Sequence, residues 1–492
     1  MIPDERLSEA TLVNLPPTVA RPTYDRACTR IGIVHLGVGA FHRAHQAAYL
    51  DALLEDAPEW AICGVSLRNP DVRDALRPQD GLYTLSLMDG GPSLRVIGAL
   101  REVLCATDER EAVLARLANP DVRLLMLTVT EKGYCLADDG LDLAHADIAH
   151  DLATPEAPVS AIGYVVAGLA RRRALGLPAY TVLSCDNLAD NGGRLQRATV
   201  QYARGVDPAL ADWIDTHASF PRSMVDSITP ATDAALRARV DTALGLHDAW
   251  PVQREPYTQW VVEDRFCNGR PPFERVGVLL SGDIAGHDRA KLKLLNAAHS
   301  SLAYLGILMG EETVADAMRQ PLLAGFVERL MREAIAPTLD AVAGLAPDAY
   351  ISAILARFRN PDIRHLLSQI AWDGSQKLPV RIFGTLRDAH AAGRPIDGLC
   401  LPVAAWLLFV RRQARAGIVL VDPMDVALRE IGRACTGDAA LDVDRFLALD
   451  AVFGSLAQTP AVVAELGHAY ARLDADAGIA DALRCGTEGG CA

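Results

Sequence analysis

One apolar stretch of the chain carries three side chains that could together move a proton. Residues 287–306 place Lys291, Asn296 and His299 among leucines that recur at helical intervals, with no proline inside the segment. At about 100° per residue these side chains fall at roughly 0°, 140° and 80° around a helix axis. A lysine on a largely apolar helix escapes the cost of burial by lowering its pKa, as a general base requires. The alternative is an amphipathic helix whose lysine reaches solvent.

A glycine-rich turn is the second chemical signal. The β-branched run 31–36 predicts a strand, and a helical pattern follows the turn. Strand, turn and helix in this order are typical of a dinucleotide site, where backbone N–H groups bind the pyrophosphate. A histidine replaces the third glycine of G-x-G-x-x-G, so a plain strand-to-helix turn stays an alternative. The candidate cofactor residues are Gly37, Gly39, Ala40, Phe41 and His42.

The end of the next predicted strand, 60–67, bears on the choice between NAD and NADP. An acid at this position binds the ribose hydroxyls of NAD, whereas an arginine accommodates a 2′-phosphate. Arg68 and Asn69 follow the strand directly, and Asp71 comes shortly afterwards. The residues themselves leave the choice of cofactor open.

Two further predicted strands, 122–129 and 179–183, lead into the polar segments 130–134 and 184–188. Ligands of open α/β sheets bind beyond the carboxyl ends of the strands, so both segments are candidate site walls. Ordinary turn chemistry is the alternative, since Asp, Asn and Gly also serve turns. A helix is expected at 161–174, and 276–280 is expected to be the last strand.

From about residue 284 the patterns are long and helical. The predicted fold is therefore an α/β, Rossmann-like N-terminal domain with a parallel sheet, residues 1–283, followed by a mainly α-helical C-terminal domain, residues 284–492. The expected helices span 290–308, 312–334, 349–358, 361–371, 400–415, 424–435, 441–456 and 460–484.

Composition narrows the class of protein. The net charge of −14 argues against general binding to nucleic acid or anionic membranes. The ten cysteines form no C-x-x-C pair and no zinc spacing, which favours reduced thiols, no metal site and a cytoplasmic location. The N-terminus has no apolar signal region, and the longest apolar run, 399–410, is too short to span a bilayer. A buried helix is the better interpretation of that run.

Several motifs together resemble the long-chain mannitol dehydrogenase family of polyol dehydrogenases and hexuronate reductases. They follow one another in the family's order through most of the chain: GVGAFHRAH (37–45), TVTEKGYC (128–135), SCDN (184–187), FPxxMVD (220–226), QWVxED (259–264), KLxLLNxxHS (291–300) and DGSQKLP (373–379). The resemblance implies zinc-independent hydride transfer between NAD(H) and a secondary alcohol or ketone of an open-chain sugar derivative. NADP is the less favoured cofactor.

The resemblance also implies roles for individual residues. Lys291 resembles the family's catalytic lysine, a base in oxidation and an acid in reduction. Asn187 and Asn296 resemble the amides that hydrogen-bond the reacting oxygen, while His299 resembles the histidine that holds the substrate hydroxyl. Three further positions carry family roles: Asp226 as a polar substrate contact, Asp71 as the aspartate that selects NAD, and Asp288, where the family has Glu, as an acid linked to proton release.

The substrate is expected to be a small sugar acid or polyol. A carboxylate favours charge-assisted donors, and Lys132, Lys377 and Arg381 look like the fructuronate reductase version of the motifs. We therefore expect reduction of fructuronate to mannonate first and oxidation of mannitol to fructose second. Another class of function is a non-catalytic sensor of the nucleotide and a sugar acid. The protein is expected to be a monomer or a small homo-oligomer.

Overall fold

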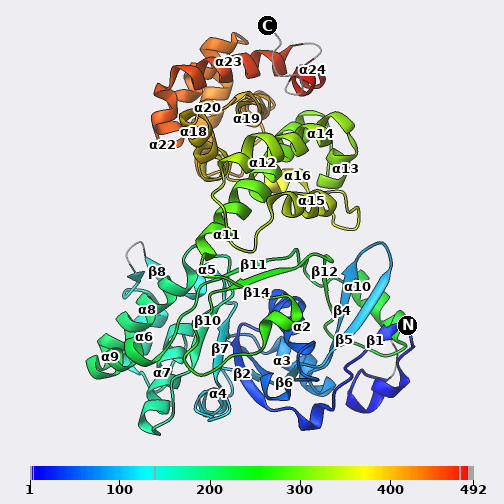
Figure 1. Ribbon diagram of the computed structural model, residues 1–492, viewed down its shortest axis with the longest axis vertical. Helices are drawn as coiled ribbons and strands as arrows, with labels where there is room; N and C mark the ends of the chain where they lie inside the picture. Colours follow the sequence, from blue (N-terminus) through cyan, green and yellow to red (C-terminus); the bar gives the residue numbers. More distant parts are fainter. Residues whose placement is uncertain (1–2, 4, 138–139, 476–477, 486–492) are drawn as a thin grey trace. The chain divides into compact units, whose positions relative to one another are not determined.

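A computed structural model describes residues 3, 5–137, 140–475 and 478–485 (Figure 1). The chain divides into two compact units, Met1–Ala285 and Gly286–Ala492. Among the described residues, no helix is both long enough and apolar enough to cross a membrane.

A five-stranded parallel sheet organises the first unit and confirms the predicted α/β class. Its strand order is β10-β7-β2-β3-β6, so all the carboxyl ends meet at one edge. The strands predicted around β2, β3, β7 and β10 are confirmed, and no observed end differs from the predicted end by more than two residues. The bounds are β2 Ile31–Leu36, β3 Ala61–Ser66, β6 Leu100–Cys105, β7 Leu124–Leu127 and β10 Thr181–Ser184.

Both faces of this sheet are buried, which explains the uninterrupted apolar runs. Successive residues of a strand point to opposite faces, and in β2 Ile33 packs into one core while Val34 packs into the other. Helix α7, Ala161–Ala174, matches its predicted range and belongs to the second of these cores. The other helices of the unit are α1 Ala40–Ala44, α2 Gln46–Asp51, α3 Asp71–Leu76, α4 Arg110–Leu117, α5 Thr130–Gly133, α6 Ala146–Ala153, α8 Asn191–Val206, α9 Pro208–His217 and α10 Ala234–Leu244.

Apart from one at 276–280, short strands outside the main sheet were not predicted. One sheet has the order β1-β5-β4-β12 and another the order β11-β13-β14. The strand predicted at 276–280 is mostly wrong, because Phe273–Val276 forms a 3-10 helix and Gly277 turns the chain with a φ of +85°. Only Leu279–Leu280 remains as β14. The remaining bounds are β1 Val19–Ala20, β4 Tyr83–Met88, β5 Pro92–Ile97, β8 Leu136–Ala137, β9 Gly140–Leu141, β11 Ser223–Asp226, β12 Val252–Arg254 and β13 Gln259–Val262.

The second unit is helical, as predicted. Helix α19, Asp397–Arg415, contains the apolar run 399–410 and is buried along most of its length, so the interpretation of that run as a buried helix is confirmed. Helices α12, Ala297–Leu308, and α23, Pro460–Asp474, pack against it. The other helices are α11 Ile284–Ala290, α13 Val314–Arg319, α14 Pro321–Arg329, α15 Pro347–Phe358, α17 Gly374–Leu378, α18 Gly384–Ala391, α20 Asp425–Ala434, α21 Ala439–Leu447, α22 Asp450–Phe453 and α24 Gly478–Cys485.

The helix predicted at 361–371 is wrong over most of its length. Only Leu367–Ile370 is helical, as α16. The residues before it bond to a distant segment instead: the Val314 N–H donates to the His365 carbonyl, and Leu366 pairs with Thr313 as an isolated bridge. Backbone groups satisfied by a neighbouring segment do not need helical partners.

Candidate active site

The turn after β2 has the backbone geometry of a phosphate-binding loop. Gly37 has a φ of +91°, and a Cβ at this position would lie 2.0 Å from the Thr128 carbonyl oxygen. Only glycine allows this approach of two backbones. A Cβ at Gly39 would meet nothing within 4 Å, so this glycine leaves open space beside the turn. The turn therefore has both features that a pyrophosphate requires: a tight bend and an accessible backbone.

His42 takes the place of the fingerprint's third glycine, whose role is close packing of helix and strand. Its imidazole is fully buried and stacks on the His35 ring of β2, with 3.4 Å between ring centroids. Burial lowers the pKa of His42 to about 3, with smaller contributions from Arg43 and His45. A neutral imidazole pair thus makes the helix–strand contact, and only the His42 backbone could face a cofactor.

The Thr128 hydroxyl joins β7 to the same turn. It donates to the Gly37 carbonyl at 2.7 Å and lies 2.9 Å from His35 Nε2. Because its hydrogen is used toward Gly37, the hydroxyl accepts from His35, which places the His35 proton on Nε2. The turn is therefore connected to both neighbours of β2, since the Gly37 N–H also donates to the Val65 carbonyl of β3.

Two groups at the end of β3 bear on cofactor choice. Asp71 begins α3, and its exposed side chain follows a turn in which the Asn69 side chain accepts from the Asp71 N–H. Arg68 is exposed, and its guanidinium pairs with the carboxylate of Asp147. The guanidinium nearest the end of β3 therefore already has a partner within the chain.

Asp186 ties the two predicted site walls together. Its carboxylate accepts from the N–H groups of Val129 and Thr130, both at 3.0 Å, and from the Tyr134 hydroxyl at 2.7 Å. Tyr134 is fully buried and also lies 2.6 Å from the Ser184 hydroxyl. The segments that follow β7 and β10 are thus held by one half-buried acid. Sequence reasoning placed Asp186 in a wall but missed this function.

Three predicted substrate residues lie on or next to these walls. Asn187 is exposed directly after Asp186, and Lys132 is exposed on α5. Asp226 is buried at the end of β11. Asn191, another residue that sequence reasoning missed, joins β11 to the wall after β10: its amide donates to the carbonyls of Ser223 at 2.8 Å and Asp186 at 3.1 Å.

The helix predicted at 287–306 exists, but it is not a regular α-helix. Lys291–Asn296 forms a π-helix, η6, between α11 and α12. The rotation of 100° per residue does not hold in a π-turn, where residues i and i+5 are hydrogen-bond partners. Lys291 and Asn296 are five residues apart, so they lie about one turn apart instead of at 140°. Lys293 points elsewhere and forms an ion pair with Asp388 at 2.7 Å.

The surroundings of His299 are apolar and cationic. Its ring packs against Phe358, with 4.6 Å between centroids, and against His365 at 5.1 Å. Burial, followed by His365, Arg357 and Arg381, holds the pKa of His299 well below its usual value. The imidazole is therefore neutral at physiological pH and can both donate and accept a hydrogen bond.

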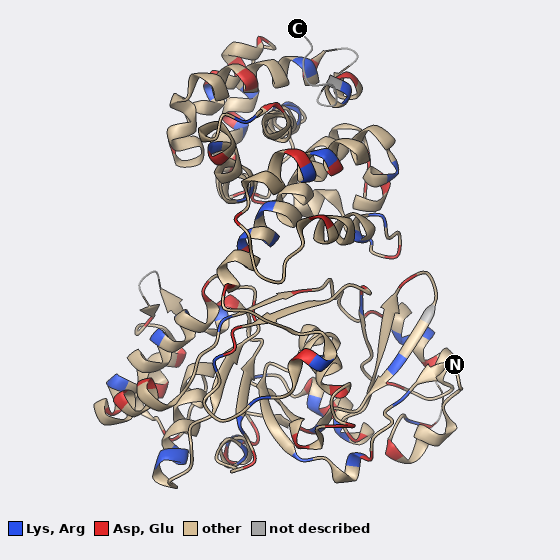
Figure 2. Cartoon of the chain, viewed as in Figure 1, with Lys and Arg blue, Asp and Glu red and all other residues tan. Residues whose placement is uncertain are grey.

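Two predicted anion-binding residues lie near this helix, although Lys and Arg positions alternate with Asp and Glu over both units (Figure 2). Arg381 belongs to another π-helix, η9, Pro379–Phe383, and donates to the Ser300 hydroxyl at 3.1 Å. Burial lowers the pKa of Arg381, and the opposing influence is Tyr304 rather than a carboxylate. Lys377 lies 3.9 Å from Asp373, and burial, followed by Arg381, lowers its pKa. The two cationic side chains are therefore close enough to influence each other, and Asp373 is paired with one of them.

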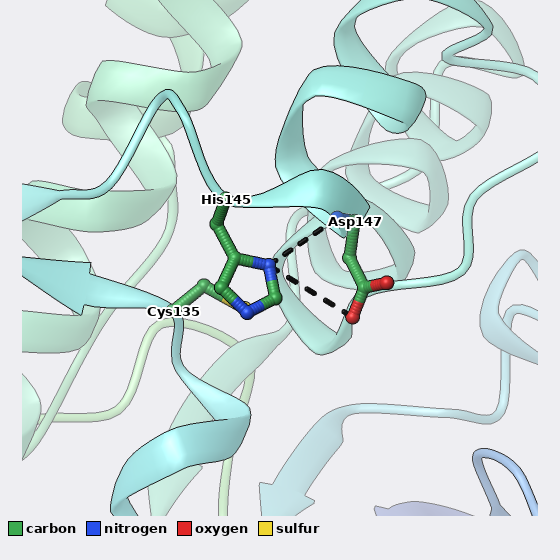
Figure 3. Close-up of side chains that lie close together, drawn as sticks. All are labelled: Cys135, His145 and Asp147. Carbon is green, nitrogen blue, oxygen red and sulfur yellow. Dashed lines mark hydrogen bonds and ion pairs between the residues drawn. The ribbon is translucent and has the colours of Figure 1, made fainter.

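Cys135, His145 and Asp147 come together although their spacing predicted no metal site (Figure 3). Their possible ligand atoms all lie within 4.8 Å of one another. Two of the three groups are already used: Asp147 pairs with Arg68, and His145 Nδ1 accepts from the Asp147 N–H at 3.2 Å. Burial raises the pKa of the Cys135 thiol to about 11. The cluster is arranged as an ion pair and a helix cap, and we assign no metal to it.

Comparison with known proteins gives consistent matches over both units. The mannitol dehydrogenase Rossmann domain matches residues 31–275, and the mannitol dehydrogenase C-terminal domain matches residues 283–474. A mannitol 2-dehydrogenase of Phaeosphaeria nodorum is 41% identical over 418 residues, which cover 82% of this chain and 74% of the relative. A D-mannonate oxidoreductase of Escherichia coli is 41% identical over 471 residues, covering 94% and 96%.

A solved structure is similar over the same length. The Pseudomonas fluorescens mannitol 2-dehydrogenase, in a ternary complex with NAD and D-mannitol, is 38% identical with a TM-score of 0.77. The similarity covers 98% of this chain and 99% of that one.

The two glycines of the turn are expected to respond differently to alanine. Gly37→Ala places a Cβ against the Thr128 carbonyl at a positive φ, so we expect a loss of about 3 kcal/mol in the free energy of unfolding. Gly39→Ala has room for its Cβ, so its stability should match the wild type while its Kd for NADH rises about tenfold. Urea unfolding and NADH fluorescence titration measure both quantities. An unchanged Kd for Gly39→Ala would contradict the phosphate-loop assignment.

Asp288, on α11, is expected to make stability depend on pH. Burial raises its pKa to about 6, and Lys291 opposes this rise. The carboxylate form therefore costs stability: the cost is absent below about pH 4, grows up to pH 6 and is complete above it. Asp288→Asn should raise the Tm by about 1–2 °C at pH 7.5 and leave it unchanged at pH 4. Thermal unfolding at several pH values tests this, and a difference independent of pH would contradict it.

Proposed function

Because the chain belongs to the mannitol dehydrogenase family, it is an NAD-dependent polyol or sugar-acid dehydrogenase, and we propose that its preferred substrate is a hexuronate. The proposed reaction is the interconversion of D-fructuronate and D-mannonate with NADH and NAD. Oxidation of D-mannitol to D-fructose is the second candidate.

The arginine beside α12 supports the sugar acid. The guanidinium of Arg381 donates to the Ser300 hydroxyl, and Ser300 directly follows the candidate substrate residue His299. A half-buried guanidinium without a carboxylate among the groups that shift its pKa is suited to an anionic partner. Lys377, also half-buried, adds a second cation. We propose that these two residues, with Lys132, bind the substrate carboxylate.

A separate observation supports the mannitol alternative. Relatives named mannitol 2-dehydrogenase match this chain at the same identity as the D-mannonate oxidoreductase. The similar solved structure also holds D-mannitol. The two candidates share every residue proposed for the chemical step and differ only in what the far end of the substrate requires.

The chemical step is a hydride transfer coupled to a proton transfer. NADH, when bound, supplies the hydride that reaches the carbonyl carbon during reduction. We propose that the Lys291 ammonium gives its proton to the carbonyl oxygen and becomes a neutral amine. In oxidation the neutral amine takes the proton of the substrate hydroxyl. The proton count closes in both directions without a metal ion.

The amides and His299 stabilise and orient the reacting group. Negative charge on the oxygen is greatest in the transition state, where N–H donors from Asn187 and Asn296 contribute most. The π-turn that brings Asn296 and Lys291 about one turn apart supplies an amide and a base on one rigid helix. His299, neutral because of its burial, hydrogen-bonds the substrate hydroxyl beside them.

For the cofactor we propose NAD in preference to NADP. The glycine turn fits a pyrophosphate, Asp71 lies exposed after β3, and Arg68 is paired with Asp147. Gly37, Gly39, Ala40 and the backbone of Phe41 and His42 are the proposed contacts with the cofactor.

Lys291→Ala tests the catalytic assignment. We expect kcat to fall at least about 1,000-fold in both directions, because the proton donor and acceptor is lost. The Kd for NADH should stay within about twofold, which separates a chemical defect from a folding defect. Lys293→Ala is the matched control, since Lys293 lies on the same helix and pairs with Asp388. Undiminished turnover by Lys291→Ala would overturn the assignment, and wild-type protein that binds NADH without turning over any substrate would favour a sensor.

The order of substrates is tested by steady-state kinetics with purified protein. We expect kcat/KM with NADH to be at least about tenfold higher for fructuronate than for fructose, because only the acid gains charge-assisted hydrogen bonds. Mannitol, arabinitol, mannonate and tagaturonate complete the panel, each with NAD(H) and NADP(H). Arg381→Leu should remove most of the preference for the acid. A higher kcat/KM for fructose would reverse the order.

A further inference from the structure

Two imidazole nitrogens lie buried near each other without hydrogen-bond partners. In the part of the chain that the structure describes, neither His299 Nε2 nor His365 Nδ1 has a partner. The rings are 5.1 Å apart between centroids and meet edge to face, at 76°. Both residues belong to the second unit. His365 lies in the segment 361–371, which was predicted to be a regular helix, and no chemical role was predicted for it.

The position of His365 is set by its backbone. Its N–H donates to the Ile363 carbonyl at 2.8 Å, and its carbonyl accepts from Val314 at 3.0 Å. The next hydrogen bond along, from the Leu367 N–H to the Glu312 carbonyl, is also 3.0 Å. These bonds hold the segment before α16 in an irregular path. That path, and not a helix face, presents the imidazole to His299.

Buried nitrogens without partners are costly, about 1–3 kcal/mol each. They occur in native proteins where a ligand or a water completes the hydrogen bonds. His299 is already the proposed contact for a substrate hydroxyl. His365, whose ring packs against that of His299 and also has a nitrogen without a hydrogen-bond partner, is therefore placed to bind the same ligand.

The charge state of the pair identifies the chemistry of the missing partner. Burial lowers the pKa of both histidines, and Arg357 acts in the same direction on each. Both rings are therefore neutral at physiological pH, with one N–H donor and one acceptor nitrogen. A hydroxyl group also donates once and accepts, so neutral imidazoles suit a hydroxyl better than an anion. Nearby Arg381 remains available for the carboxylate.

We propose that His365 is a substrate-binding residue that hydrogen-bonds a hydroxyl of the open-chain sugar next to the hydroxyl held by His299. The inference rests on the proposed function, because it requires a polyhydroxylated substrate. It adds a specificity determinant: a site with two imidazoles in a row selects substrates with hydroxyl groups on neighbouring carbons. Phe358, packed against His299, closes the apolar side of the pair.

The test combines variants of His365 with substrate analogues. His365→Leu removes both hydrogen-bonding nitrogens, so we expect the KM for the best wild-type substrate to rise at least about tenfold. We expect kcat to change less than threefold, since Lys291 and the amides remain, and the Kd for NADH to stay unchanged. His365→Gln, which keeps a donor and an acceptor, should recover most of the lost affinity. His390→Leu is the control, an exposed histidine on α18 of the same unit.

Deoxy analogues of that substrate locate the contact. For the analogue that lacks the proposed hydroxyl, wild type and His365→Leu should have the same KM, because the interaction is already absent. An unchanged KM in His365→Leu overturns the proposal, and so does a rise in KM that accompanies weaker NADH binding or that no deoxy analogue abolishes. Wild-type protein that turns over no member of the substrate panel overturns the proposed function itself, so the two failures are distinguishable.

Discussion

The two polar segments that form the predicted site walls of the first unit depend on one half-buried carboxylate, that of Asp186. Two neighbouring parallel strands, β7 and β10, end at the same edge of the sheet, and each continues into a polar segment. Left alone, such segments would be mobile surface loops. Asp186 accepts hydrogen bonds from two backbone N–H groups and a buried tyrosine of the opposite segment. These bonds hold the two segments together. The exposed Asn187 amide is positioned because the residue before it is held.

In the second unit a π-turn has the corresponding role. A π-turn widens a helix and is rarely stable unless its surroundings require it. Here two such turns, η6 and η9, pack against each other. They carry Lys291, Asn296 and Arg381. Irregular helical turns thus place the polar groups, while the regular helices α12 and α19 form the buried frame around them.

Burial keeps a pair of histidines neutral in each of the two units. The imidazoles of His35 and His42 behind the glycine turn are neutral, and so are those of His299 and His365. In the first pair, stacked rings replace a glycine and let a helix approach a strand. In the second pair, neutral rings leave donors and acceptors for an uncharged group. The same physical effect therefore accompanies helix–strand packing in one unit and, in our proposal, substrate recognition in the other.

Sequence patterns alone determined the elements that depend on local periodicity. The parallel strands β2, β3, β7 and β10 and the buried α19 were predicted because each is a continuous apolar run. The order of motifs along the chain also singled out Lys291, Asn187 and His299. Short strands and the irregular path around His365 were not predictable, because they depend on hydrogen bonds to segments far away in the chain. The π-turns were not predictable because the packing of η6 against η9 joins segments about 85 residues apart.

Tertiary structure alone decided which residues contact one another and which protonation state the buried ones adopt. Asp186, Asn191 and His365 have no distinctive spacing, and their roles arise from partners between 5 and 66 residues away. Likewise, a rotation of 100° per residue separates Lys291 from Asn296, and only the packing that stabilises the π-turn reduces this separation. Periodicity reports the local balance of apolar and polar residues, whereas the geometry of a site is set by contacts that this balance does not encode.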